Sequence, residues 1–289
     1  MSTQKHILVT GANGQLGMEF RALEKSYPGY HFLFATREEL PVNDEDAINA
    51  FFVKNVISHC INCAAYTAVD KAETEPEEAF KINAEAVKKL AEACQSHEAL
   101  FIHISTDYVF NGEGSSPYSE TDPTSPVSVY GSSKLKGEAL AREYCEETII
   151  IRTSWVYSRY GKNFVKTMMR LMAEKDSIGV VSDQFGAPTY AADLAEAILQ
   201  IINRFEKPAS GIYHYSNLGL ISWFDFARAI KEISKSNCIV NPIETAAYPT
   251  PARRPHYSVL DTTKLRKTFG INIPEWKESL EKCMALLNA

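Results

Sequence analysis

Short apolar runs and amphipathic segments alternate along the first half of the chain. The runs have the length and composition of buried strands, and the segments between them carry apolar residues at the spacing of one helix face. This alternation predicts parallel βαβ units, and hence an α/β fold with a Rossmann-type, doubly wound parallel sheet. The expected strands span residues 7–10, 31–35, 56–62, 100–105 and 148–153, and the expected helices span 15–25, 45–54, 72–96 and 132–144.

The regular alternation ends near residue 155. Beyond it aromatic residues and prolines become more frequent, and the segment 247–257 has the composition of a loop. We therefore expect a Rossmann domain over residues 1–155 and a smaller, mixed α/β lobe over residues 156–289, partly interleaved with the sheet.

Composition and charge exclude several classes of protein. The chain has 289 residues, 45% of them apolar and 23% charged, and a net charge of -6. This charge predicts no binding to nucleic acid or to an anionic membrane, so an anionic ligand needs a local Arg or Lys. There is no apolar run of membrane-spanning length, we expect no signal peptide, and the six cysteines are too sparse for a disulfide scaffold. We therefore expect a cytoplasmic protein.

Three glycines follow the first expected strand. Gly11, Gly14 and Gly17, in GANGQLG, stand where the strand ends and the helix begins. Glycine there allows a positive-φ turn, the approach of backbone N–H groups to a diphosphate, and close helix–strand packing. The spacing differs from the general G-x-G-x-x-G fingerprint, and a structural turn is the alternative. The position predicts that the domain 1–155 binds a dinucleotide and that the lobe binds the substrate.

The end of the second expected strand bears on the choice of cofactor. An acidic residue there binds the ribose 2′-hydroxyl of NAD(H), whereas an arginine accepts the 2′-phosphate of NADP(H). Thr36 and Arg37 occupy this place, which favours NADP(H). Glu38 and Glu39 follow directly, so binding of NAD(H) stays possible. Alternatively, Arg37 is an exposed turn residue that binds no cofactor.

Tyr130 and Lys134 lie four residues apart at the start of an expected helix. They share one helix face, so the Lys134 ammonium is expected beside the Tyr130 phenol, where a cation lowers the pKa of the phenol. A phenol of lowered pKa serves as a general acid or base near neutral pH. The pair follows the fourth expected strand, near the sheet edge where open α/β folds bind ligands.

The fourth expected strand ends in the polar sequence STDYVF. Thr106 is a candidate to donate a hydrogen bond to a substrate carbonyl and polarise it. Asp107 is a candidate to position the loop or to cap the turn that follows. A Ser/Thr turn that closes the strand is the alternative.

With these motifs, the chain resembles the extended short-chain dehydrogenase/reductase family, and within it the dTDP-4-dehydrorhamnose reductases. The resemblance runs along nearly the whole chain, and several long motifs in one order are more specific than the Tyr-x-x-x-Lys pair. The motifs are GANGQLG (11–17), NCAAYTAVDKAETEP (62–76), STDYVF (105–110), VYGSSKLKGE (129–138), IRTSWVYS (151–158), NFVKTMMRL (163–171), DQFGAPTY (183–190) and YPTPARRP (248–255).

The resemblance implies a triad of Thr106, Tyr130 and Lys134. It implies reduction of the 4-keto group of dTDP-6-deoxy-L-lyxo-4-hexulose to dTDP-L-rhamnose, with hydride from NAD(P)H and a proton from Tyr130. Thr106 would hold the carbonyl oxygen, and Lys134 would tune Tyr130 and bind the nicotinamide ribose. The other cofactor-binding residues that it implies are Gly11, Gly14, Gln15, Leu16, Gly17, Ala64 and Ala65.

The resemblance also implies substrate contacts. It places Trp155 against the sugar and Arg254 near the nucleotide diphosphate, where an acidic protein needs a local cation. A core tryptophan and a solvated loop charge are the respective alternatives. Asp107 and Asn163 complete the expected substrate-binding set, and Thr67 is a weaker candidate.

The chain departs from its relatives at two places. Pro41 stands where they often carry an aspartate, so the adenine-side contacts are expected to differ. Some relatives form a dimer around magnesium held by glutamates, and Glu19 matches one such position whereas Ala192 stands at another. We therefore predict no metal site, and a homodimer of another kind stays open. The Cys60–Cys63 spacing lies on an expected strand, where such residues point to opposite faces.

Other functions fit the same motifs. Another NDP-sugar reductase or epimerase of this superfamily would keep the triad and change the sugar pocket. A non-catalytic regulatory subunit, such as one resembling the β subunit of methionine adenosyltransferase, would tolerate damage to the triad, which is complete here. A plain NADP-binding sensor is a third alternative.

Overall fold

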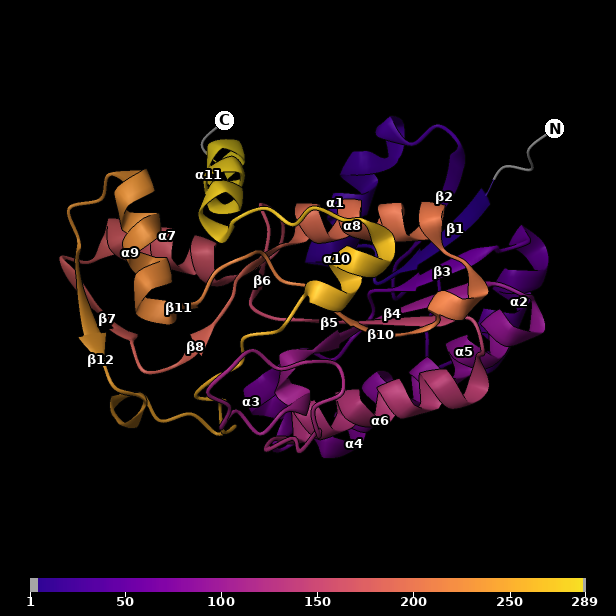
Figure 1. Ribbon diagram of the computed structural model, residues 1–289, viewed down its shortest axis with the longest axis horizontal. Coiled ribbons are helices and arrows are strands. Elements are labelled where there is room, and N and C mark those ends of the chain that lie inside the picture. Colours follow the sequence, from indigo (N-terminus) through magenta and orange to yellow (C-terminus); the bar gives the residue numbers. More distant parts are fainter. Residues whose placement is uncertain (1–4, 288–289) are drawn as a thin grey trace.

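Six parallel strands form one sheet through the centre of the chain (Figure 1). The computed structural model describes residues 5–287, and the strand order is β10-β5-β4-β3-β1-β2. Every pairing in this sheet is parallel, which confirms the predicted α/β class. The strands are β1 (Lys5–Thr10), β2 (Tyr30–Ala35), β3 (His59–Asn62), β4 (Leu100–Thr106), β5 (Thr148–Thr153) and β10 (Gly211–His214).

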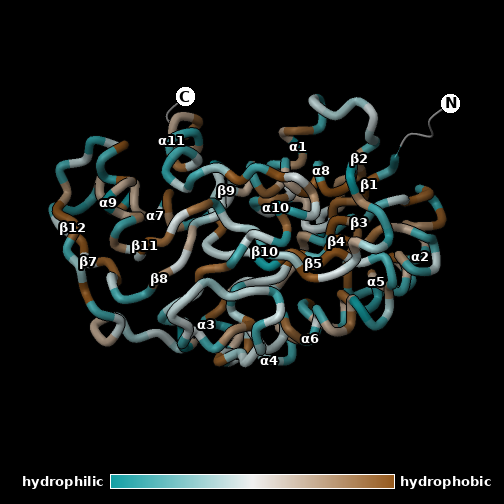
Figure 2. Tube along the Cα trace, in the orientation of Figure 1, coloured by the Kyte–Doolittle hydropathy of each residue, from teal (hydrophilic) through white to brown (hydrophobic). Residues whose placement is uncertain are grey.

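Side chains of these strands alternate between two buried apolar layers. Ile7 and Val9 of β1 pack in a layer with α1, α8 and α10, whereas Leu8 between them packs in a layer with α2, α5 and α6. Because both faces are covered, the strands are mostly apolar, as Figure 2 shows along the centre of the molecule. The helices are α1 (Gln15–Leu23), α2 (Glu45–Asn55), α5 (Ala86–Ser96), α6 (Val129–Tyr144), α8 (Ala191–Arg204) and α10 (Thr263–Phe269).

The long helix expected over residues 72–96 is interrupted. It consists of α3 (Val69–Ala72), α4 (Pro76–Phe80), a π-helical segment (Lys81–Glu85) and α5. The π-helical segment carries Asn83, whose amide exchanges hydrogen bonds of 2.9 and 3.0 Å with the Tyr66 backbone. The interruption therefore fixes the loop that follows β3, next to the ends of the central strands.

Some element boundaries also differ from the expectation. β3 begins at residue 59 rather than 56, because Val56 ends α2 in the left-handed region with φ 49°. α6 begins at Val129, three residues before the expected start, because Ser128 caps it and accepts from the Gly131 N–H at 3.1 Å. This places Tyr130 in the first turn of α6.

The second half of the chain forms a smaller lobe and also returns to the sheet. α8 covers the sheet and β10 pairs with β5, whereas α7 (Phe164–Glu174), α9 (Trp223–Ser234) and α11 (Trp276–Leu287) share a separate core. Figure 1 shows this lobe to the left of the sheet. No helix within residues 5–287 is long and apolar enough to cross a membrane. The lobe strands are β6 (Val156–Tyr157), β7 (Ser177–Val181), β8 (Phe185–Gly186), β9 (Thr189–Tyr190), β11 (Ile221–Ser222) and β12 (Ile239–Ile243).

Candidate active site

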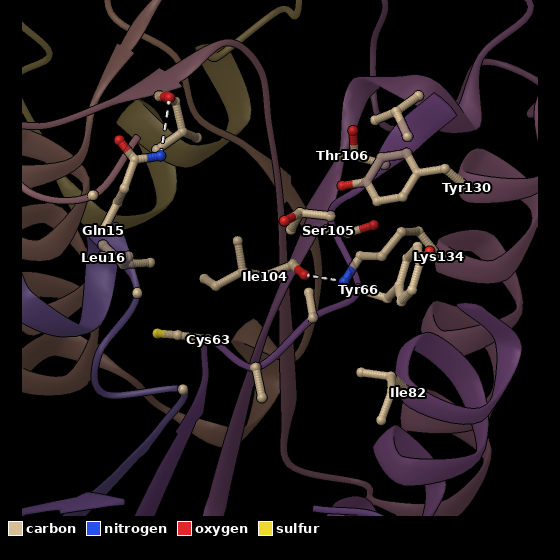
Figure 3. Close-up of a pocket in the computed structure, with 18 of the residues that line it drawn as sticks. Gln15, Leu16, Cys63, Tyr66, Ile82, Ile104, Ser105, Thr106, Tyr130 and Lys134 are labelled. Atoms are coloured by element: carbon tan, nitrogen blue, oxygen red, sulfur yellow. Dashed lines mark hydrogen bonds between the residues drawn. The ribbon is translucent and has the colours of Figure 1, made fainter. Parts of the chain in front are cut away.

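A cavity of about 940 Å³ lies at the carboxyl ends of β1, β3, β4 and β5. The glycine loop, the loop after β3, the end of β4 and the turn after β5 line it, and the first turn of α6 closes one side (Figure 3). The predicted site residues that line it are Gly11, Gly14, Gln15, Leu16, Arg37, Ala64, Ala65, Thr106, Asp107, Tyr130, Lys134 and Trp155.

The glycine loop forms a backbone cradle at one end of this cavity. Gly11 has φ +61°, and a Cβ there would stand 2.7 Å from the Ala64 nitrogen. Gly14 caps α1, and its N–H donates to the Gly11 carbonyl at 2.9 Å. Gly17 does not line the cavity; a Cβ on it would stand 2.6 Å from Ala12 Cα, so it permits close packing instead. First-turn N–H groups of α1 beside this cradle fit a dinucleotide diphosphate.

The end of β2 presents a cation to the same part of the cavity. The Arg37 side chain is 83% exposed, and the Glu78 carboxylate is 3.9 Å from it. Glu38 also lines the cavity. Glu39 instead accepts from the Thr36 N–H at 2.9 Å, and this hydrogen bond lowers the pKa of its carboxyl. Glu39, one of the two acids that could bind the ribose 2′-hydroxyl of NAD(H), is therefore already hydrogen-bonded within the turn.

Thr106 and Tyr130 bring two hydroxyls together. A Cβ on Gly131 would stand 2.2 Å from the Tyr108 carbonyl oxygen, so the first turn of α6 packs directly on the end of β4. The Tyr130 phenol then lies beside the Thr106 hydroxyl (Figure 3). Burial raises the pKa of Tyr130 to about 12, although the contact with Thr106 acts in the opposite direction.

Lys134 does not lie where the helix spacing predicted. Its Nζ donates to the Ile104 carbonyl at 2.6 Å and lies 3.2 Å from His103 Nε2. The expectation of an ammonium that lowers the pKa of the Tyr130 phenol is wrong for this structure, because burial dominates and raises that pKa. Burial also lowers the pKa of Lys134, to about 8. The shared helix face brings the two residues to one cavity but leaves the ammonium with other partners.

Asp107 is a partner of Thr106. It begins the 3-10 turn Asp107–Val109, and its Oδ1 accepts from Thr106 Oγ1 at 2.9 Å. The Thr106 oxygen accepts in turn from the Tyr108 N–H at 3.2 Å. Burial raises the pKa of Asp107 to about 6. The Thr106 proton therefore points to Asp107 and must turn away from it to reach a substrate oxygen.

Trp155 lies between the cavity and the lobe core. It adopts φ 49°, and its indole stacks on Trp223 with ring centroids 3.6 Å apart. A Cβ on Gly186 would stand 2.6 Å from the Trp155 ring, so the strand beneath fits closely around it. The side chain is half-buried and lines the cavity, so Trp155 is both part of the core and exposed to the space where a ligand would bind.

The other two predicted substrate residues already have partners. Asn163 caps α7, accepts from the Lys166 N–H at 3.1 Å, and donates to Gln15 Oε1 at 2.9 Å. Arg254 donates to both carboxylate oxygens of Asp70, at 2.9 and 2.8 Å. Neither Asn163 nor Arg254 lines the cavity, so their expected contacts with substrate stay predictions.

Two buried polar residues beside the triad escaped the sequence analysis. His103 lies within β4, and Asn62 ends β3. Their amide and ring nitrogens lie 3.1 Å apart. A polar residue inside an otherwise apolar run, as in FIHIST, is the signal that could have found His103.

No metal site is evident in the part of the chain that the structure describes. There, no group of three or more His, Cys, Asp or Glu side chains is placed to hold an ion. Glu19 is buried and accepts from Ser158 Oγ at 2.6 Å, and burial raises the pKa of its carboxyl. Cys60 and Cys63 belong to opposite apolar layers, as their spacing predicted.

A parallel Rossmann sheet with a Thr–Tyr–Lys group at its carboxyl edge is typical of short-chain dehydrogenases/reductases. The chain matches the family model described as RmlD substrate binding domain over residues 5–289. It is 42% identical to the dTDP-4-dehydrorhamnose reductase of Aggregatibacter actinomycetemcomitans, over 96% of this chain and 98% of that one. The chain therefore belongs to the dTDP-4-dehydrorhamnose reductase family, which confirms the resemblance.

Solved structures agree with this assignment. A dTDP-4-dehydrorhamnose reductase from Clostridium acetobutylicum has a TM-score of 0.93 and 42% identity, over 98% of this chain and 100% of that one. The Bacillus anthracis dTDP-4-dehydrorhamnose reductase, solved in complex with NADP, has a TM-score of 0.94 and 37% identity, with the same shares covered.

Proposed function

We propose that the protein uses NADPH to reduce the 4-keto group of dTDP-6-deoxy-L-lyxo-4-hexulose, which gives dTDP-L-rhamnose. The observation that carries this proposal is the meeting of the Thr106 and Tyr130 hydroxyls in a cavity that begins at the glycine cradle. Relatives that match nearly the whole length of the chain are reductases of this class. We place the reaction in the cytoplasm, in keeping with six free cysteines.

The chain supplies the proton and the polarising groups. When bound at the glycine cradle, NADPH would supply the hydride that C4 of the sugar accepts. Tyr130 gives its phenolic proton to the carbonyl oxygen as the C=O π bond breaks, so the product is the C4 alcohol. Because the pKa of Tyr130 is raised, the phenol holds that proton at neutral pH. Thr106 donates to the same oxygen, and the phenolate left on Tyr130 regains a proton from solvent.

The preference for NADP(H) over NAD(H) rests on the end of β2. Arg37 extends into solvent with only a long contact to Glu78, so it is available to a 2′-phosphate. Glu39 is held by the Thr36 N–H and is not available to a 2′-hydroxyl. Both features favour NADP(H), and the neighbouring Glu38 is the residue that would support NAD(H).

The test is an assay of NADPH oxidation with substrate made by the coupled dehydratase and epimerase. Tyr130→Phe is expected to lose about 10³-fold in kcat, within the range of general acid catalysis. Tyr144→Phe, at the far end of the same helix, is the matched control and should keep full activity. Equal turnover in Tyr130→Phe, or none in the native protein, would remove the proposal.

Product and cofactor analysis separate the alternatives. An epimerase would convert the sugar without net NADPH consumption, and a regulatory subunit would bind NADPH without turnover. Repeating the assay with NADH, and with Arg37→Ala, tests the cofactor preference. Loss of the preference for NADPH in Arg37→Ala is the expected result, and an unchanged ratio of kcat/KM values for the two cofactors would contradict it.

A further inference from the structure

A chain of buried polar side chains joins the strand of the glycine loop to Lys134. It crosses β1, β3 and β4, where apolar side chains otherwise fill both faces. Its members are at most 2% exposed, so each polar atom needs a partner within the protein. The contacts are Thr10 Oγ1 to Asn62 Oδ1 at 2.7 Å, Asn62 Nδ2 to His103 Nδ1 at 3.1 Å, and His103 Nε2 to Lys134 Nζ at 3.2 Å.

The backbone fixes the direction of this chain. The Ala64 N–H donates to Asn62 Oδ1 at 3.2 Å, and a backbone N–H cannot accept. The amide oxygen of Asn62 therefore points to Ala64, and its NH₂ group points to His103 Nδ1. Since Nδ1 must accept, a neutral His103 carries its proton on Nε2, which faces Lys134. Burial and the charge of Lys134 both lower the pKa of His103, which keeps the ring neutral.

This arrangement discriminates between the two protonation states of Lys134. An N–H of His103 and an ammonium both only donate, so they cannot form a hydrogen bond with one another. The contact at 3.2 Å is a hydrogen bond only for the neutral amine, whose lone pair accepts while one N–H donates to Ile104. An ammonium is repelled on this side, and the open side of its surroundings is the cavity that Tyr130 also lines.

We propose that His103 is a positioning residue for Lys134. By presenting an N–H where an ammonium needs an acceptor, it couples protonation of Lys134 to its release toward Tyr130 and a bound cofactor. The inference rests on the proposed function for the catalytic role of Lys134, whereas the geometry of the chain is independent of it. It also accounts for the position of Lys134 in this structure, docked on Ile104 and away from the phenol.

Other titratable groups face Lys134, but none of them takes the place of the His103 ring as its partner on β4. Glu138, one turn further along α6, and Cys63, after β3, both act to raise the pKa of Lys134. Glu138 is itself held by the Arg152 guanidinium at 2.9 and 2.7 Å. Tyr66 lies beside Lys134 in Figure 3, but its hydroxyl donates at 2.8 Å to Glu75, which precedes α4.

The first test uses the native protein without cofactor. Long-range ¹H–¹⁵N NMR of histidine-labelled protein shows which ring nitrogen of His103 carries the proton. We expect the Nε2–H form across the neutral pH range, and an Nδ1–H form or an imidazolium would overturn the proposal. The ¹³Cε signal of Lys134, followed with pH in labelled protein, should titrate near pH 8.

The second test compares two buried histidines. His103→Gln can turn a carbonyl toward Lys134, so the ammonium gains an acceptor there and the Lys134 titration should rise by about one pH unit, a tenfold change. We expect kcat to fall about tenfold because the ammonium stays docked. His214→Gln is the matched control, since His214 is fully buried on β10 and bonds the Tyr118 carbonyl at 3.0 Å, away from the cavity.

The outcomes are distinguishable from a failure of the proposed function. A purely structural role predicts that both variants lose stability while the Lys134 titration stays in place, and that result would overturn the proposal. If His103→Gln does not fold, the tautomer of His103 in the native protein still tests the proposal. The NMR readouts need no turnover, so an inactive native enzyme would contradict the reductase assignment and leave the His103 inference to be judged separately.

Discussion

The residues expected to bind the cofactor and those expected to bind the sugar nucleotide differ in how far they are already paired within the protein. At the glycine loop the surface is backbone, and Gly11 leaves open the space that a Cβ would fill. Arg254 and Asn163, which are expected to bind the sugar nucleotide but do not line the cavity, are already paired: Arg254 holds Asp70 through two hydrogen bonds, and Asn163 caps α7. We therefore expect a dinucleotide to dock on the open cradle, whereas a sugar nucleotide that binds Arg254 would first have to take this side chain from Asp70.

The open cradle and the paired side chains should contribute differently to ligand binding, the first to affinity and the second to specificity. Preorganised backbone donors bind a diphosphate without the expense of reordering side chains. A charged pair that has to exchange partners gives up part of its interaction energy, and it discriminates against ligands that cannot replace the lost partner. We therefore expect substitutions in the glycine cradle to act on cofactor binding, and substitutions in the lobe to act on the sugar nucleotide.

The largest expected effect comes from filling the cradle. Gly11→Ala forces a side chain into the left-handed region and toward the Ala64 nitrogen, 2.7 Å away. We expect NADPH affinity, measured by calorimetry, to fall about 100-fold, because the loop must shift to make room for the methyl group and no longer fits the diphosphate. The strain itself costs about 1–3 kcal/mol and acts on the stability of the fold. Gly29→Ala is the matched control, because nothing lies within 4 Å of a Cβ there. Equal NADPH affinity in the two variants would show that the cradle is not the cofactor site.

Asp107 makes stability depend on pH. Its folded pKa is raised from 3.8 to about 6, so its contribution to stability is present below the unfolded value and is lost as pH rises through 6. Relative to Asp107→Asn, the native protein should lose about 2–3 kcal/mol of unfolding free energy between pH 4 and 7. Denaturant unfolding at several pH values measures this.

The control for that comparison removes an exposed carboxylate. Asp46 lies on the exposed side of α2, so Asp46→Asn changes the net charge without changing a buried group. Its unfolding free energy should follow that of the native protein across the same pH range. Parallel curves for the native protein and Asp107→Asn would mean that Asp107 is not a buried acid of raised pKa.

Features that depend on the backbone and on where the strands end could be predicted from the sequence. Apolar runs predicted the parallel sheet, and the positions of Gly11, Thr106 and Tyr130 after strands predicted that they meet at one cavity. These inferences succeed because the carboxyl ends of parallel strands share one edge, whatever packs around them.

Features that depend on distant side chains were not predictable in this way. Arg254 finds Asp70 across 184 residues of sequence. The Lys134 ammonium is placed by the Ile104 carbonyl and by a histidine on another strand, and burial decides the sign of the pKa shift on Tyr130. The four-residue spacing of Tyr130 and Lys134 on a helix predicts neither how deeply the two side chains are buried nor which groups of the sheet they contact.

The smallest expected effect is at the Arg254–Asp70 pair. Arg254→Ala should raise KM for the sugar nucleotide about tenfold, as expected for one lost charge-assisted contact, and leave NADPH affinity unchanged. Arg253→Ala is the control, because that side chain is 65% exposed and forms an ion pair with Glu113, which is also exposed. Asp70→Asn sharpens the comparison: it weakens the hold on Arg254, so KM should fall a few-fold if partner exchange opposes binding. A higher KM in Asp70→Asn would instead mean that the ion pair itself shapes the binding site, and the sugar-nucleotide site would then be preorganised like the glycine cradle.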